Sequence, residues 1–169
     1  RNNRIDPDEI EAIGICNQLM TTIFWNKQTG EAVGRAIGWQ DNRTIAICDR
    51  LVAIDKNGIE GRTGSQIFPN SAAIKIRWLM ENDKAIQKGL ARKELLFGTV
   101  DSWLIWKLSG GSVHVTDPSN SCLSLLFNTT TLNYDERTLN LLGIPYDILP
   151  ELRSSSEIYA YTKPEMFFD

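Results

Sequence analysis

Gly98, Thr99 and Asp101 are the residues of this chain whose types and spacing come nearest to phosphate chemistry. Glycine lets a backbone approach a phosphate closely, and a helix that begins directly afterwards would point free N–H groups at the anion. The same residues are also typical of a plain turn in which an aspartate caps the following helix. The pattern favours the turn, and the chain has no G-x-x-x-x-G-K-[ST] motif that would form a phosphate loop.

Metal and sulfur chemistry have little support in the sequence. The chain has three cysteines and one histidine, and Cys16, Cys48 and Cys122 are far apart with no C-x-x-C spacing. A zinc site or a disulfide framework is therefore not expected, and the three thiols are predicted to be buried and reduced. Reduced thiols in turn predict a cytoplasmic setting.

Three further polar residues could act in a site, but structural roles are favoured for them. Asp41 and Arg43 precede a predicted helix, whose N-terminus favours an aspartate, so an ion pair or a role in starting the helix is expected. His114 lies between two valines and is predicted to face outward from a strand.

The elements that must position these side chains alternate between strand and helix. Residues 95–97 form a short apolar run that Gly98 ends, which is typical of a buried strand. Residues 100–108 follow with apolar side chains at three- and four-residue spacing, the period of a helix with one buried face. Further strands are predicted at residues 12–16, 21–25 and 113–115, with a hairpin between 21–25 and 35–39, and further helices at 44–54, 71–81, 84–92 and 135–142. Residues 122–127 fit either a strand or a helix, and the alternation as a whole predicts an α/β fold.

The composition is that of an ordinary soluble globular protein. The chain has 169 residues, of which 42% are hydrophobic, and its net charge is −3, which suits one domain or a part of a larger one. The mildly acidic balance argues against a nucleic-acid partner. No apolar run approaches the roughly 20 residues that cross a bilayer, so no membrane association is expected. A start at Arg1 fits a segment of a longer polypeptide.

Several stretches resemble the glycerol kinases, which are members of the FGGY carbohydrate kinase family. The clearest are ELLFGTVDSWLIWKL at residues 94–108 and VHVTDPSN at residues 113–120. AIGICNQ at residues 12–18 and WQD at residues 39–41 join them at compatible spacing, and the similarity extends from about residue 10 to residue 159. The resemblance implies part of a ribonuclease H-like, actin-like ATPase-superfamily lobe, which is a mixed sheet with flanking helices.

The resemblance also implies a reaction, namely ATP-dependent phosphoryl transfer to a hydroxyl of glycerol or a related polyol, with ATP and Mg as the cofactors of the parent protein. Kinases of this family carry their phosphate loop upstream of the region resembled, and their catalytic aspartate and most of the adenine site downstream of it. Residues 1–169 are therefore expected to be a partial N-terminal domain without catalytic or metal-binding residues, which binds no cofactor alone. The expected partners are the rest of the kinase chain and a small polyol, and a homo-oligomeric parent is an open alternative.

The same resemblance implies which residues line the polyol pocket. In glycerol kinases an Asn-Gln-Arg-Glu sequence ends the matching strand, and its Arg and Glu bind substrate hydroxyls. Here Gln18 is kept, but Leu19 and Met20 stand at the Arg and Glu positions. Trp39 matches a tryptophan that packs against the carbon backbone of the substrate, with core packing as the alternative. Asn70 stands where a substrate-contacting tyrosine is usual.

The change at Leu19 and Met20 is chemically severe. Each substrate hydroxyl left without a partner costs on the order of 1–3 kcal/mol. Losing two charged partners therefore predicts that glycerol binds about a thousandfold or more weakly than it does to an Arg-Glu pair. Two alternatives stay open: a pseudokinase or interaction protein that keeps the fold, and an FGGY kinase whose substrate is less polar or is held by other residues.

Overall fold

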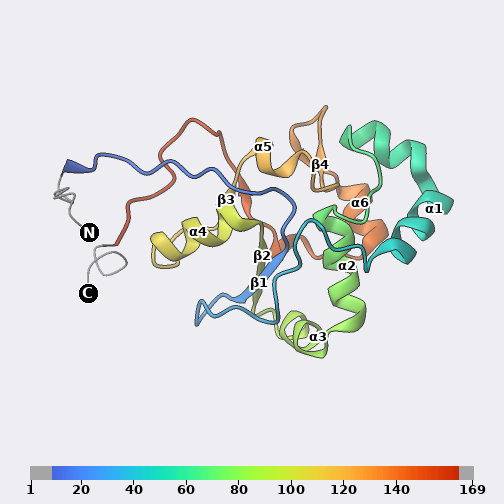
Figure 1. Ribbon diagram of the computed structural model, residues 1–169, viewed down its shortest axis with the longest axis horizontal. Coiled ribbons are helices and arrows are strands. Elements are labelled where there is room, and N and C mark those ends of the chain that lie inside the picture. The colour runs from blue at the N-terminus through green and yellow to red at the C-terminus, as the bar shows by residue number, and fades with distance from the viewer. Residues whose placement is uncertain (1–8, 164–169) are drawn as a thin grey trace.

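The computed structural model describes residues 9–163, and helices and strands alternate along them (Figure 1). The helices are α1 (Ile45–Thr63), α2 (Ala72–Asn82), α3 (Lys84–Ala91), α4 (Val100–Leu108), α5 (Pro118–Ser121), α6 (Glu136–Leu142) and the 3-10 helix η2 (Tyr146–Ile148). The strands are β1 (Ile23–Asn26), β2 (Leu95–Gly98), β3 (Val115–Thr116), β4 (Phe127–Asn128), β5 (Asn133–Tyr134) and β6 (Glu151–Leu152). The predicted α/β class is confirmed.

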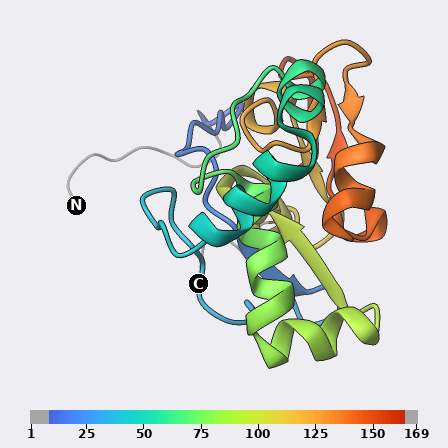
Figure 2. The ribbon, with the colours of Figure 1, turned by 90° about the vertical axis from the view of Figure 1, so that its right-hand side faces the viewer.

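Strands β1 and β2 form an antiparallel pair (Figure 2). Phe24 lies opposite Phe97 in this pair. All four residues of β2 are buried, which explains why residues 95–97 form a continuous apolar run without polar alternation. The predicted hairpin with residues 35–39 is present only in reduced form, because the returning chain makes two isolated antiparallel bridges, Trp25 with Ala32 and Thr22 with Ile37, and forms no strand. Residues 35, 36, 38 and 39 are exposed, so β2 offers β1 more apolar surface to bury.

The other strands form two small ladders. β3 pairs with β6 in parallel, and β4 pairs with β5 antiparallel. The strand predicted at residues 113–115 is reduced to β3, and the short helix α5 follows it. Residues 122–125 form turns rather than a strand or a helix, and β4 begins only at Phe127.

The helices predicted at 71–81, 84–92, 100–108 and 135–142 are confirmed as α2, α3, α4 and α6. Local caps fix two of their starts, since the Asp83 carboxylate accepts from the backbone N–H of Ala85 and Ile86, and Asp135 accepts from Thr138. Gly143 ends α6 in the left-handed conformation.

Helix α1 is longer than the predicted helix at residues 44–54. Asp55 leaves helical geometry, with φ −158° and ψ 51°, but the helix resumes and ends only at Thr63, where Gly64 caps it in the left-handed conformation. Arg62 from the second half places a guanidinium nitrogen 3.5 Å from the Asp55 carboxylate and also binds Asp135 at 3.0 Å. The end predicted for this helix at residue 54 is therefore a kink.

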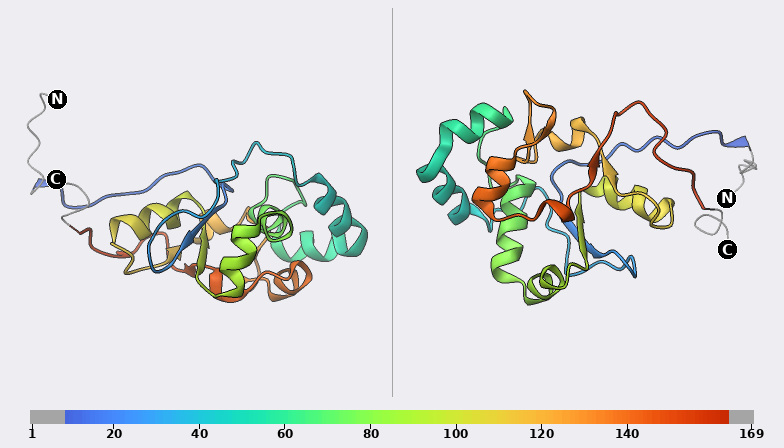
Figure 3. Two further views of the ribbon diagram at one scale, coloured as in Figure 1. Left: turned by 90° about the horizontal axis from the view of Figure 1, so that it is seen from below. Right: turned by 180° about the vertical axis from the view of Figure 1, so that it is seen from behind.

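The strand predicted at residues 12–16 is wrong, because the structure assigns no strand there. The segment is extended and largely exposed, with Ile13 at 49% exposure, and it passes α4 at the same end of the molecule as the C-terminal segment (Figures 1 and 3). An apolar run becomes a strand only where a neighbouring backbone pairs with it. The burial predicted for the thiols is also wrong for Cys16, which is exposed; Cys48 is buried and Cys122 is half-buried.

The buried residues form two clusters. The larger one joins α1, α2 and α6 to the Phe24–Phe97 side of the β1–β2 pair. The smaller one contains Ile23, Trp25 and Leu96, and it packs against Trp103 and Trp106 of α4. No helix among residues 9–163 is both long enough and apolar enough to pass through a membrane.

Gly98 lies where β2 meets α4, in a position without room for a larger side chain. A Cβ at this position would lie 2.5 Å from Ser102 Cβ and 2.7 Å from Trp25 Cη2. Gly98→Ala must therefore push α4 away from β1, and it should lower the free energy of unfolding by about 1–3 kcal/mol. Urea unfolding measures this loss. Gly38→Ala is the matched control, because no atom lies within 4 Å of its added Cβ, and equal stability of the two variants would contradict the prediction.

Candidate functional site

The candidate site begins at the bend of residues 17–20, which leads from the exposed N-terminal segment into β1. Gln18 is exposed, and its side-chain amide donates to Thr21 Oγ1 at 2.9 Å. Leu19 and Met20 are half-buried and are not among the residues of the two buried clusters. Met20 has a φ of 65°, a left-handed conformation that turns the chain sharply before β1. The two side chains replacing the Arg-Glu pair thus lie near the surface.

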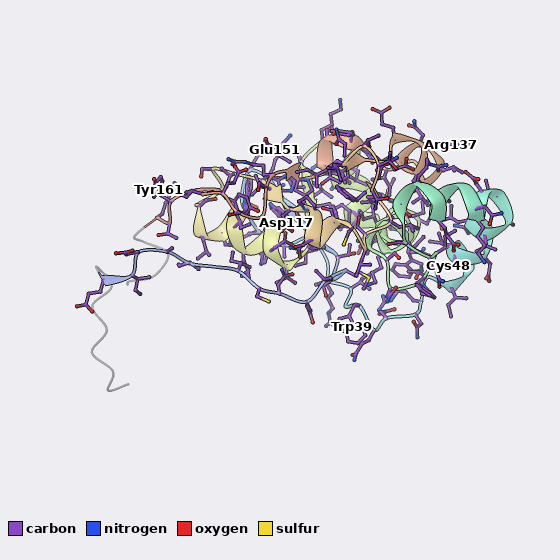
Figure 4. The ribbon with its side chains drawn as sticks, turned by 90° about the horizontal axis from the view of Figure 1, so that it is seen from above. Trp39, Cys48, Asp117, Arg137, Glu151 and Tyr161 are labelled. Atoms are coloured by element: carbon purple, nitrogen blue, oxygen red, sulfur yellow. The ribbon has the colours of Figure 1, made fainter. Side chains whose placement is uncertain are left out.

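Trp39 lies on a segment beside this bend. Thr22 and Ile37 exchange two backbone hydrogen bonds of 3.0 Å each, so the stretches that carry Met20 and Trp39 run side by side. The Trp39 indole is 44% exposed and points away from the body of the molecule (Figure 4). Core packing, the alternative for this residue, is therefore wrong, and the indole is available to a ligand.

Lys75 links two of the predicted positions through their backbones. Its Nζ donates to the carbonyl oxygen of Met20 at 3.0 Å and to that of Asn70 at 2.7 Å. The whole residue is buried, with 0% exposure, and burial lowers its pKa to about 8 although the nearby negative charge of Asp41 opposes this shift. Sequence reasoning missed Lys75. The available signal was a lysine between two isoleucines in the most apolar part of the predicted helix.

The loop that carries Asn70 is fixed from both sides. Asn70 itself is half-buried, and the carbonyl oxygen of the preceding Pro69 accepts from Thr44 Oγ1 at 2.7 Å. Thr44 directly precedes α1, and Ser71 directly precedes α2. The loop is therefore held between the starts of two helices.

The predicted ion pair of Asp41 and Arg43 is confirmed. The Arg43 guanidinium donates to both Asp41 oxygens, with Nε 2.9 Å from each, and this hydrogen bonding lowers the pKa of the Asp41 carboxyl. The guanidinium also lies 4.9 Å from the ring centroid of Trp78. The pair joins the segment after Trp39 to α2.

Residues 98 and 99 connect β2 directly to α4, as the turn interpretation predicted, but the predicted aspartate cap is wrong, because Asp101 lies within α4 and no side chain caps the start of this helix. Asp101 is buried and accepts hydrogen bonds from the hydroxyls of Thr99 and Thr116, the second at 2.6 Å. Burial raises the pKa of this carboxyl, while the two hydroxyls oppose the shift. Its oxygens are thus used within the protein.

The outward orientation predicted for His114 is wrong. β3 begins only at Val115, so strand alternation does not apply to His114, which is half-buried. Its Nε2 lies 2.8 Å from the carbonyl oxygen of Phe97, and its ring meets Trp25 edge-on at a centroid distance of 5.2 Å. A carbonyl oxygen can only accept, so Nε2 carries the proton. Burial lowers the pKa of His114 to about 4.

A cavity of about 510 Å³ lies elsewhere, between residues 10–15, α4 and the C-terminal segment 155–162. None of the five predicted substrate residues lines it. A chain of amide and carboxylate hydrogen bonds borders it, from Asn17 to Asn120 at 3.0 Å and from Asn120 to Asp117 at 2.9 Å. In the described part of the chain, no group of three or more His, Cys, Asp or Glu side chains gathers to hold a metal.

The chain matches known proteins along its whole length. The family model described as the FGGY family of carbohydrate kinases, N-terminal domain, matches residues 1–169. A glycerol kinase of Stenotrophomonas maltophilia (strain K279a) is 47% identical over 167 residues, and one of Thermus thermophilus is 45% identical over 166. Each alignment covers 98% of this chain and 34% of the relative, so the chain spans about a third of the length of these relatives.

Solved structures agree with the sequence matches. The crystal structure of Plasmodium falciparum glycerol kinase with ADP superposes with a TM-score of 0.88 at 31% identity, covering 93% of this chain and 31% of that one. A gluconate kinase from Lactobacillus acidophilus has a TM-score of 0.75 at 22% identity, covering 88% and 29%, which supports the fold alone. The predicted actin-like lobe is thereby confirmed. The chain belongs to the FGGY family of carbohydrate kinases.

Proposed function

We propose that this chain is an internal part of the N-terminal domain of a parent kinase that transfers a phosphoryl group from ATP to a hydroxyl of glycerol or a related polyol. The observation that carries the proposal is the 47% identity with a glycerol kinase over 98% of the chain. The named relatives are kinases, so they give the pseudokinase alternative no support.

In this proposal the chain supplies one wall of the polyol pocket, formed by Gln18, Leu19, Met20, Trp39 and Asn70. The exposed indole of Trp39 would pack against the carbon atoms of the substrate. The exposed amide of Gln18 would meet a hydroxyl. The apolar side chains of Leu19 and Met20 favour a substrate that is less polar than glycerol where it contacts them. The alternative is a substrate whose hydroxyls are held by other parts of the parent kinase.

We also propose that residues 9–163 do not themselves form a metal-nucleotide site. Among residues 9–163 no cluster of potential metal ligands is present. The one carboxylate directly after β2, Asp101, is occupied by two hydroxyls. We therefore propose that the ATP and Mg contacts and the catalytic base come from other parts of a cytoplasmic parent kinase, and that the rest of that chain and the polyol are the partners of this segment.

The proposal is tested by ADP release from the parent kinase, coupled to NADH oxidation, with glycerol, erythritol, dihydroxyacetone and 1,2-propanediol as acceptors. We expect ADP release that depends on at least one acceptor. We also expect Trp39→Ala to raise the KM for that acceptor about tenfold, because stacking of the carbon backbone is lost. Tyr161→Ala, which removes another exposed aromatic ring, is the control and should leave KM unchanged.

Two results would count against the proposal. An absence of acceptor-dependent ADP release across the panel would favour the pseudokinase alternative. A KM that does not change in Trp39→Ala would remove Trp39 from the substrate wall while leaving the kinase assignment intact.

A further inference from the structure

Lys75 is a cation in a place where packing alone would select an apolar side chain. Its neighbours on α2, Ile74 and Ile76, are fully buried, and so are Ala72 and Ala73. An ammonium group without partners is very unfavourable in such surroundings. The presence of Lys75 therefore requires acceptors that hold it.

The acceptors are two backbone carbonyl groups from separate loops. Nζ binds the oxygen of Asn70, five residues before it in the chain, and that of Met20, fifty-five residues before it. Within residues 9–163, Lys75 forms no ion pair. Asp41, the carboxylate whose charge acts on the pKa of Lys75, is paired with Arg43. The ammonium thus acts as a hydrogen-bond donor that ties the bend of residues 17–20 to the loop before α2.

Both hydrogen bonds of Lys75 go to backbone carbonyl groups of residues in the proposed substrate wall, Met20 and Asn70. The Met20 carbonyl belongs to a residue with a φ of 65°, a conformation that non-glycine residues hold only where the surroundings stabilise it. The same bend continues into Thr22, whose backbone bridge to Ile37 leads to Trp39. The hydrogen bond from Lys75 Nζ thus sets the position of Met20 directly. It acts on Trp39 only indirectly, through the bridge between Thr22 and Ile37.

We propose that Lys75 is a positioning residue for the polyol pocket: its buried ammonium clamps the Met20 bend to the Asn70 loop and so fixes the spacing of the substrate wall. The proposal rests on the proposed function, because the spacing of this wall affects substrate binding only if the wall contacts a polyol. Lys75 does not touch the substrate, since the residue has no exposed surface.

The experiment compares the parent kinase with Lys75→Met, which keeps the length of the side chain and removes its donors. We expect faster hydrogen–deuterium exchange in residues 17–22 and 68–71, with α3 and α6 unchanged. We expect the KM for the polyol to rise about tenfold or more and the KM for ATP to stay within about twofold, because a displaced wall affects only the substrate that it contacts. Lys88→Met removes an equal charge from an exposed position of α3 and is the matched control.

Each outcome decides the proposal. Unchanged exchange in both segments would overturn the clamp, whether or not the parent kinase acts on polyols. Faster exchange with an unchanged polyol KM would overturn its role in the pocket. If the unmodified parent kinase has no polyol-dependent activity, the proposed function fails by that assay, and the exchange experiment still decides the clamp. Should Lys75→Met fail to fold, Lys75→Gln, which keeps a donor of shorter reach, is expected to show the same changes in milder form.

Discussion

Glycerol binding by the parent kinase is expected to tighten about a thousandfold when Leu19→Arg and Met20→Glu are combined. The two new side chains would give the substrate hydroxyls charged hydrogen-bond partners, each contributing on the order of 1–3 kcal/mol, and every 1.4 kcal/mol is about tenfold in affinity. Both positions are half-buried and lie outside the buried clusters, so the charged groups can stay in contact with water before substrate binds. Neither change enlarges a packed core.

The backbone geometry of the bend should survive these substitutions. Lys75 binds the carbonyl oxygen of Met20 and leaves its side chain free, so Met20→Glu keeps that contact. The left-handed conformation at this position is as unfavourable for methionine as for glutamate, so no new backbone strain is introduced. The gain should therefore appear in substrate binding with little change in stability.

Isothermal titration with glycerol measures the effect, and the KM for glycerol in the ADP-release assay provides a second measurement. Leu132→Arg is the control, because Leu132 is a 66% exposed apolar residue far along the chain from the bend. An unchanged dissociation constant in the double variant would show that positions 19 and 20 do not face the substrate. Steady ADP release by the unmodified parent kinase at millimolar glycerol would contradict a damaged glycerol site.

Local sequence signals predicted those elements whose formation depends on neighbouring residues. Asp83 and Asp135 cap the starts of α3 and α6, and Gly143 ends α6, so these helices could be placed from the sequence. β2 was recognisable because every one of its residues is apolar or glycine and both faces are covered. The continuation of α1 beyond Asp55 was missed, since Arg62 and Arg137 stabilise the kink from a distance that no local pattern reports.

Long-range pairing limited the rest of the prediction. The apolar run of residues 12–16 has strand composition, but strand formation depends on a partner backbone. The candidate site shows the same limit. Resemblance indicated Met20 and Asn70 separately, whereas the ammonium that joins their carbonyl groups depends on the packing of α2. A lysine between two isoleucines of a predicted helix is the one sequence feature that could have indicated such a contact.

Acidification is expected to destabilise the folded protein through His114. The pKa of this imidazole is about 4 in the folded protein, against 6.5 for an unperturbed histidine, because burial disfavours its charged form. Between these two values the unfolded chain binds a proton that the folded protein does not. The full contribution of His114 to stability is therefore present above about pH 6.5, is lost as the pH falls towards 4, and does not change further below that value. The loss should reach about 3 kcal/mol.

Urea unfolding of the parent kinase's N-terminal lobe, followed by tryptophan fluorescence at several pH values between about 7.5 and 4, measures this loss. His114→Gln is the matched variant, because its side-chain amide can still donate to the Phe97 carbonyl oxygen but does not titrate. Asp101 acts in the opposite sense, since burial raises the pKa of its carboxyl and folding then favours the protonated form at low pH. The difference between the wild-type and His114→Gln curves cancels that contribution, because both proteins keep Asp101. Parallel curves for the two proteins would show that His114 is not held neutral by the contacts with Phe97 and Trp25.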